Sequence, residues 1–178
     1  MLFQVFDLHY SHFVPPGLRT CPHCKRTGHM LGHGFLRGYG DNQAREVRGR
    51  RLYCSSRGRH TGCGKTQSIW DSAVIPRFSL PARLLWRFLD LWQQGLSRWK
   101  AYSQVFGKSD RSRPYQICKQ FKRAQSALRD RLLRKGCSPP LGDTAIPEIQ
   151  TIRHILTAFA DSQCPIQAFQ EHFQTAFL

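Results

Sequence analysis

The stretch CPHCKRTGHMLGHGFLRGYGDNQAREVRGRRLYCSSRGRHTGCGK, residues 21–65, decides the fold because it holds four cysteines in two pairs. Cys21 and Cys24 have C-x-x-C spacing, and Cys54 and Cys63 form the second pair. Two such pairs of thiolates can close one tetrahedral zinc site. Four protein ligands leave no open coordination position for water or substrate, so we predict one structural Zn²⁺ ion.

Glycines and a polar turn between the two cysteine pairs predict a β-hairpin. Residues 32–40 and 46–53 read as short strands on either side of Asp41-Asn42. Residues 64–70 can add a third strand, which completes the outline of a zinc ribbon. So small a sheet has almost no core of its own, and structural zinc in such domains contributes roughly 10 to 16 kcal/mol.

The second cysteine pair is spaced widely for a zinc site. Eight residues separate Cys54 from Cys63, where about two to four are commoner. His60 in this loop, or His23 in the first pair, is therefore an alternative ligand, and a protein without metal is the remaining alternative. His29 and His33 read as ordinary surface residues.

The chain of 178 residues has a formal net charge of +16, and the positive charge is concentrated before residue 141. Residues 1–80 hold 12 Lys+Arg and 4 Asp+Glu, residues 81–140 hold 14 and 3, and residues 141–178 hold 1 and 4. Basic clusters on a folded chain with aromatic residues are typical of nucleic-acid binding. A ribosome-like structural protein and a merely solvated basic surface are the alternatives.

The sequence has seven cysteines, no recognisable secretion signal and no long apolar stretch. These features predict a soluble protein with reduced or metal-bound thiols and no membrane contact. We expect it in the cytoplasm, associated with the nucleoid.

Helical periodicity replaces the strand pattern after the ribbon. The first predicted helix runs from residue 80 to about 94 with Ser79 as its N-cap. Ser97 can cap a second helix over 98–106, in which Trp99 falls on the apolar face. A third helix is predicted from Ser112 or Arg113 to about Lys135, and its apolar stripe is Ile117, Phe121, Ala124, Leu128 and Leu132.

The last two of these helices match the helix-turn-helix outline, because the second carries one apolar and one basic face. The third helix would then enter the major groove. The residues expected nearest base edges are Arg111, Arg113, Tyr115, Gln116 and Lys119. The residues expected to meet phosphates are Lys122 and Arg123, together with the ribbon arginines Arg45, Arg48, Arg50, Arg51, Arg57 and Arg59. A three-helix bundle with a solvated basic face is the alternative.

The chain divides into five parts on this interpretation. They are an N-terminal extension (1–17), the zinc ribbon (18–78), the helix-turn-helix bundle (79–136), a Pro/Gly-rich linker (137–147) and an acidic helical pair (148–178). The last pair is too small to stand alone. We expect it to dock on the bundle or to form a homo-oligomer with another copy.

Catalytic motifs are missing from the sequence, so we predict a binding protein and not an enzyme. The 11 acidic residues do not form the carboxylate clusters of two-metal nucleases, and no phosphate-binding loop or nucleophile elbow is seen. An HNH-type nuclease is the one enzymatic alternative, and it would need His60 or a nearby histidine as the base.

One known family shares these features. Cys21-Pro22-His23-Cys24, the glycine-containing hairpin, residues 50–59, residues 62–66 and the helices that follow resemble the N-terminal zinc ribbon and helix-turn-helix portion of bacterial insertion-sequence transposases. Small stand-alone proteins encoded beside such elements look similar. The resemblance covers about residues 18–135, and it implies that Cys21, Cys24, Cys54 and Cys63 are zinc ligands in a module that recognises element DNA.

Two departures limit what the resemblance implies. The loop between Cys54 and Cys63 is long, and no catalytic domain is present, so transposase activity is not carried over. We expect an α+β protein that binds specific double-stranded DNA as a transposase accessory or a truncated transposase. Its expected protein partner is a separate transposase or another element-encoded protein. An RNA-binding ribonucleoprotein subunit is the main alternative, because Phe35, Tyr39 and Tyr53 could stack on unpaired bases.

Overall fold

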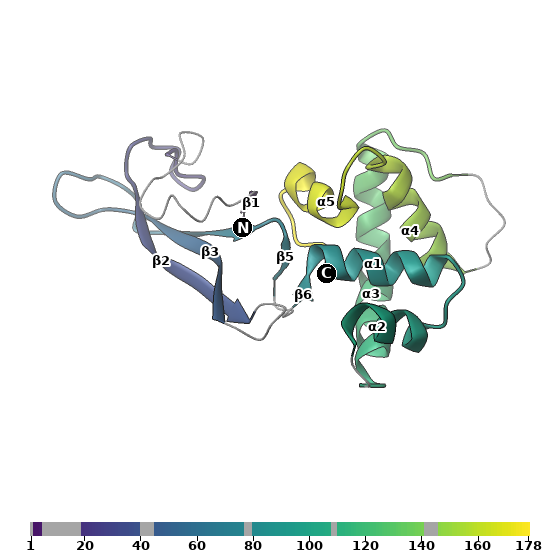
Figure 1. Ribbon diagram of the computed structural model, residues 1–178. Helices are drawn as coiled ribbons and strands as arrows, with labels where there is room; N and C mark the ends of the chain where they lie inside the picture. Colours follow the sequence, from purple (N-terminus) through teal and green to yellow (C-terminus); the bar gives the residue numbers. More distant parts are fainter. Residues whose placement is uncertain (1, 5–18, 40–44, 77–79, 108–109, 141–145) are drawn as a thin grey trace.

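The predicted α+β class is confirmed by a computed structural model. It describes residues 2–4, 19–39, 45–76, 80–107, 110–140 and 146–178. A β-sheet forms one end of the molecule and five helices form the other (Figure 1). The metal-ligand candidates lie in the sheet half, and the longest basic helix lies in the helical half.

The sheet is built on the predicted hairpin. Strands β2 (Met30–Tyr39), β3 (Arg45–Cys54) and β4 (Thr66–Asp71) are antiparallel neighbours, so the hairpin and the third strand are confirmed. A fourth strand, β1 (Leu2–Gln4), pairs in parallel with β4 and gives the order β1-β4-β3-β2. The predicted N-terminal extension thus contributes a strand to the sheet.

A short strand pair connects the sheet to the helices. Strands β5 (Val74–Ile75) and β6 (Leu80–Pro81) pair, and helix α1 (Ala82–Gln93) follows at once. The structure corrects the predicted start of this helix, because Leu80 and Pro81 are strand residues and Pro81 is the N-cap. Ser79, the predicted cap, lies outside the described residues.

The next two helices have the predicted bounds. Helix α2 (Arg98–Phe106) begins where the Ser97 side chain accepts a hydrogen bond from the Lys100 amide, and it ends at Gly107 in the left-handed conformation. Helix α3 (Arg113–Arg134) buries Ile117, Phe121, Leu128 and Leu132 of the predicted apolar stripe, and Ala124, its fifth member, is half-buried against the same core. Trp99 is the exception: its side chain is 38% exposed, and Arg111 lies over its ring.

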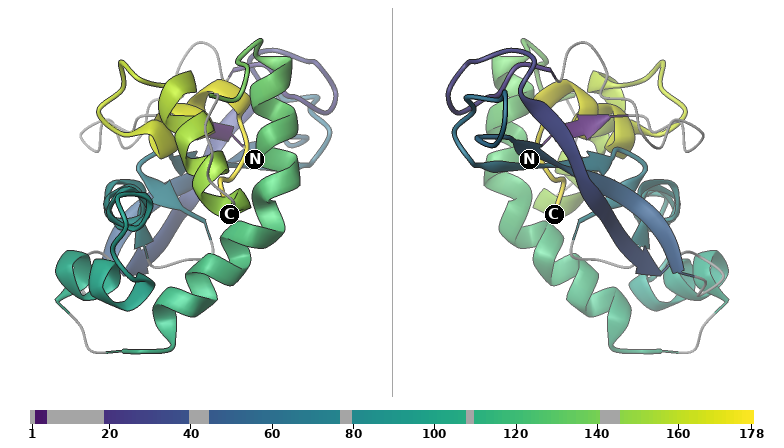
Figure 2. Two further views of the ribbon diagram at one scale, coloured as in Figure 1. Left: turned by 90° about the vertical axis from the view of Figure 1, so that its right-hand side faces the viewer. Right: turned by 90° about the vertical axis from the view of Figure 1, so that its left-hand side faces the viewer.

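The last two helices complete the same core. Helices α4 (Pro147–Ala158) and α5 (Pro165–Phe173) pack against α1, and α4 also packs along α3. One hydrophobic cluster joins residues from Ile75 to Phe177, so the apolar faces of the C-terminal helices are used within the chain. Figure 2 shows α3 running diagonally past this group, with the N-terminal part of the helix extending beyond α4 and α5. No helix among the described ranges is both long and apolar enough to cross a bilayer.

Gln170 joins the helical half to the end of the sheet half. Its buried side chain donates to the carbonyls of Ser72 and Val74, at 2.7 and 3.0 Å, and accepts from the Phe177 amide at 3.1 Å. The neighbouring Glu171 accepts a hydrogen bond from the Ser72 hydroxyl at 2.6 Å. One side chain therefore holds three backbone groups from two distant segments.

We predict that Gln170→Ala lowers the free energy of unfolding of the helical half by at least about 2 kcal/mol, because each buried polar group that loses its partner costs about 1 to 3 kcal/mol. Urea unfolding followed by far-UV circular dichroism measures the change. Gln163→Ala is the matched control, since Gln163 is exposed. A loss below about 0.5 kcal/mol, the usual size of a surface substitution, would contradict the prediction.

Candidate metal centre and basic surfaces

The four predicted cysteine ligands come together at one end of the sheet. The Sγ atoms of Cys21 and Cys63 are 3.7 Å apart, as are those of Cys24 and Cys54, and all four sulfurs lie within 4.8 Å of one another. Sulfurs bound tetrahedrally to zinc at about 2.3 Å lie roughly 3.8 Å from each other. The cluster therefore has the size needed to hold one metal ion.

The first pair of cysteines is presented by a tight turn. The Cys21 amide donates to the Arg26 carbonyl, and the Lys25 amide donates to the Cys21 carbonyl, both at 2.9 Å. Lys25 adopts a left-handed conformation with φ of 61°, which a non-glycine side chain rarely takes. The turn folds Cys24 back beside Cys21, and the Thr20–Thr27 bridge closes its base.

The wide spacing of the second pair does not separate its two sulfurs. The Cys54 amide donates to the Lys65 carbonyl and the Gly64 amide to the Cys54 carbonyl, so β3 and β4 stay paired up to the cysteines. The eight intervening residues project as a loop that closes where the Gly62 amide meets the Ser55 carbonyl at 2.6 Å. Cys63 thus returns next to Cys54, and its amide donates to the Cys54 sulfur at 3.3 Å.

Gly62 is a residue of this centre that the sequence analysis did not single out. A Cβ atom at this position would lie 2.5 Å from the Cys54 sulfur and 2.4 Å from the Ser55 carbonyl oxygen. Real Cβ atoms do not approach other atoms so closely. The available signal was the Gly62-Cys63-Gly64 run, because glycines next to a ligand often mark a close backbone approach.

Burial raises the pKa of both buried thiols, but hydrogen bonds with the neighbouring thiols lower the pKa of Cys21 and raise that of Cys54. Burial raises the pKa of Cys21, but the amides of Cys24 and His23 and neighbouring thiols donate to its sulfur and lower the pKa to about 7. Burial dominates at Cys54 and raises its pKa to about 12. A bound cation deprotonates coordinating thiols, so metal uptake by this cluster releases protons.

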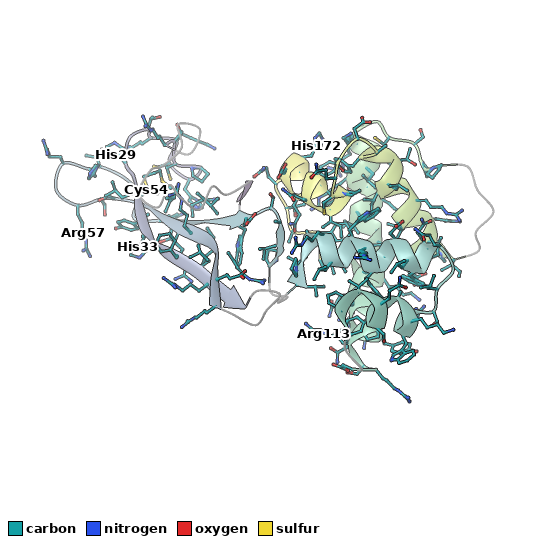
Figure 3. The ribbon with its side chains drawn as sticks, in the orientation of Figure 1. His29, His33, Cys54, Arg57, Arg113 and His172 are labelled. Carbon is teal, nitrogen blue, oxygen red and sulfur yellow. The ribbon has the colours of Figure 1, made fainter. Side chains whose placement is uncertain are left out.

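The alternative histidine ligands do not belong to the cluster. His60 lies against His29 instead, with their Nδ1 atoms 3.4 Å apart and their rings edge to face. His23 is exposed beside the first pair. Figure 3 shows His29 and Arg57 at the same end of the sheet as Cys54. The four cysteines are therefore the ligand set that this structure brings together.

The apolar core of the sheet half is very small. It consists of Cys21, Met30, Leu52, Cys54 and Ile69, with Cys24 packed against it. Two of its five members are candidate metal ligands, so the metal centre and the core are the same part of the molecule. A core of this size supplies little stability by itself, and a metal ion held by the four cysteines would add to it.

The ribbon arginines that were predicted to meet phosphates divide into two groups. Arg45, Arg51, Arg57 and Arg59 are exposed. Arg48 and Arg50 are 5% and 7% exposed, and burial lowers the pKa of the Arg50 guanidinium. Alternation along β3 points both side chains to the same face as buried Leu52, so their burial differs from the exposure expected of phosphate contacts.

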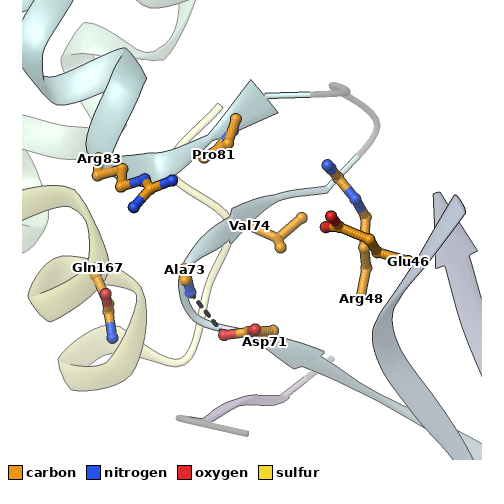
Figure 4. Close-up of a pocket in the computed structure, with 8 residues that line it drawn as sticks. All are labelled: Glu46, Arg48, Asp71, Ala73, Val74, Pro81, Arg83 and Gln167. Atoms are coloured by element: carbon orange, nitrogen blue, oxygen red, sulfur yellow. Dashed lines mark hydrogen bonds between the residues drawn. The ribbon is translucent and has the colours of Figure 1, made fainter. Parts of the chain in front are cut away.

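Arg48 instead lines a cavity of about 410 Å³ between the sheet and the helices. Figure 4 shows it with Glu46 and Asp71 from the sheet side and Arg83 from α1. Burial raises the pKa of Asp71, while the Ala73 amide donates to this carboxyl at 2.9 Å. Positive and negative groups are mixed here, so this cavity has no clear preference for an anion.

The outer face of α3 is basic and open to solvent. Tyr115 is 54% exposed, and Gln116, Lys119, Lys122 and Arg123 are also exposed. Arg111 is exposed in the preceding turn, whereas Arg113 is half-buried. Arg129 has a structural role, since its guanidinium donates to the Thr151 hydroxyl and to the Pro147 carbonyl.

The start of α3 is fixed by Asp110. Its Oδ1 atom accepts hydrogen bonds from the Ser112 amide and hydroxyl, both at 2.9 Å, and from the Arg113 amide at 3.3 Å. These hydrogen bonds lower the pKa of the Asp110 carboxyl. The first turn of the helix, which carries the predicted base-reading residues, therefore has a defined direction.

Comparison with protein-family models, with curated proteins and with solved structures finds no match to this chain. The candidate functions consequently rest on the cysteine cluster and the basic surfaces.

Proposed function

We propose that this protein binds double-stranded DNA through a zinc-stabilised ribbon and a helix-turn-helix formed by α2 and α3. The observation that carries the proposal is the division of α3 into a buried apolar stripe and an exposed face with Lys119, Lys122 and Arg123. A helix of 22 residues with this division suits the major groove, which admits one α-helix.

Zinc is the proposed ion because four thiolates at tetrahedral spacing are the usual ligand set of structural zinc. The ion has no open coordination position in such a set, so its role is to hold the ribbon. The exposed arginines Arg45, Arg51, Arg57 and Arg59 then supply phosphate contacts beside those of α3. We propose binding without bond breaking, and the resemblance to insertion-sequence proteins suggests a transposase accessory.

The salt dependence of DNA affinity tests this proposal. If roughly eight phosphates are neutralised, the plot of log affinity against log salt concentration has a slope near about −7. Selection of tightly bound duplexes from a random pool gives the preferred sequence. Fluorescence anisotropy with a labelled blunt duplex of that sequence, at several salt concentrations, then gives the slope. A slope near zero would remove the proposal.

We predict that the triple variant Lys119→Ala, Lys122→Ala, Arg123→Ala makes the slope shallower by about two, because Lys122 and Arg123 are the expected phosphate contacts and each lost contact changes the slope by about one. Arg87→Ala is the matched control, since Arg87 is an exposed arginine of α1 outside the proposed contact set. An unchanged slope in the triple variant would show that α3 does not contact the DNA.

Equal competition by structured RNA would favour the alternative of an RNA-binding protein.

A further inference from the structure

A hollow of about 590 Å³ opens beside the metal centre, between β2, the end of β3 and the loop of residues 55–62. Leu31 and Tyr53 contribute side chains from paired positions of the two strands. His33 follows on β2, and Arg57 and His60 belong to the loop. Figure 3 shows His33 and Arg57 at this end of the sheet.

The strand side of the hollow is aromatic and apolar. The rings of His33 and Tyr53 have their centroids 5.5 Å apart at an angle of 39°, His33 is exposed and Tyr53 is half-buried. Leu31 is 41% exposed beside them. Solvent-accessible aromatic side chains are what an unpaired base stacks on, whereas the bases of a duplex already stack on each other.

The loop side of the hollow is held in place by its own hydrogen bonds. The Arg57 amide donates to the Ser55 hydroxyl at 3.2 Å, and the His60 amide donates to the Arg57 carbonyl at 3.1 Å. The Arg26 guanidinium from the first cysteine turn donates to the Thr61 carbonyl. The metal cluster requires only that Cys63 lies next to Cys54. The loop of residues 55–62 is longer than this requires, and it forms one side of the hollow.

The charge around the hollow favours an anion. Arg57 lines it, and Arg59 is exposed in the same loop. Residues 19–70 contain two acidic residues, Asp41 and Glu46, and Glu46 lies at the opposite end of β3 from Cys54. An aromatic floor with a cationic rim is the arrangement by which proteins hold a base together with its phosphate.

We propose that this hollow binds one unpaired nucleotide of the DNA, with its base against His33 and Tyr53 and its phosphate on Arg57. The inference rests on the proposed function, because it adds a single-strand contact to a protein that holds DNA through α3. The hollow would be occupied where the DNA exposes an unpaired base, at a duplex end, a nick or a distorted base pair.

Two oligonucleotides with the same phosphate charge separate stacking from electrostatics. One is a single-stranded dT 12-mer, and the other is a 12-mer backbone without bases. Base stacking on one aromatic site is expected to make the dT 12-mer bind about tenfold more tightly to the zinc-loaded protein. Tyr53→Ala should remove this difference and Tyr53→Phe should keep it, while Arg57→Ala should weaken both oligonucleotides alike.

His33→Ala provides a second test, because His33 is exposed and its replacement leaves the core intact. It should also reduce the preference for the dT 12-mer. Equal affinity of the two oligonucleotides for the unaltered protein, or a preference that survives both His33→Ala and Tyr53→Ala, would overturn the inference. The proposed function fails in a different way, because the blunt duplex would then show no salt-dependent binding.

Discussion

Replacement of Cys54 by serine should release the metal ion and unfold the sheet half of the protein while the five helices stay folded. Cys54 is buried, belongs to the small core of that half and is one of the four clustered sulfurs. Structural zinc in small domains is worth about 10 to 16 kcal/mol, far more than this core supplies. Zinc content by elemental analysis and amide chemical shifts of β2, β3 and β4 measure the two effects.

A matched control for this experiment is Cys137→Ser. Cys137 is half-buried and lies outside the four-cysteine cluster, so this variant should keep one equivalent of zinc and the native spectrum. Addition of a strong chelator to the unaltered protein should reproduce the effect of Cys54→Ser. A sheet that keeps its chemical shifts and its DNA affinity after metal removal would contradict both the structural role of the ion and the proposed mechanism.

Phe121→Ala should lower the free energy of unfolding of the helical half by about 3 to 5 kcal/mol. The Phe121 side chain is fully buried on α3 and stacks on Phe177, with ring centroids 6.0 Å apart. Phe177 in turn meets Phe169 of α5 edge to face at 5.5 Å. The cavity left by alanine would therefore remove contacts that hold the C-terminal segment to the helix proposed to read DNA.

Urea unfolding of the zinc-loaded protein, followed at the helical far-UV signal, measures this loss. Phe35→Ala is the control, because Phe35 is 43% exposed on β2 and its removal should change stability by no more than about 0.5 kcal/mol. Similar unfolding midpoints for the two variants would show that the core is not organised around Phe121.

Features that depend on residues close together in the sequence could be predicted from local sequence patterns. The glycine-containing hairpin, the Ser97 cap and the apolar stripe of α3 each follow from spacing within one element, and the structure contains all three. The four candidate metal ligands could also be predicted from the sequence, because two pairs of cysteines in one short segment are typical of a zinc site. The loop length that complicated the second pair proved compatible with the cluster.

Features that depend on distant partners were not predictable in the same way. The strand β1 acquires its place only by pairing with β4, and Leu80 and Pro81 become strand residues by pairing with β5. The burial of Arg48 and Arg50 had a usable signal, since both share the parity of Leu52 and Cys54 along the strand. Their positive charge favoured the opposite interpretation, but side-chain alternation decides the direction.

The contact of Gln170 with the carbonyls of Ser72 and Val74 joins residues 98 and 96 positions apart. During synthesis on the ribosome, this junction must wait until α5 has emerged, whereas the four clustered cysteines, the last of which is Cys63, emerge much earlier. The sheet half would thus fold first, and the contacts of Gln170 with Ser72 and Val74 would form last. Contacts between residues so far apart in sequence slow folding. If the proposed zinc site is correct, nascent chains halted before residue 170 would bind zinc and leave the link between the two halves open.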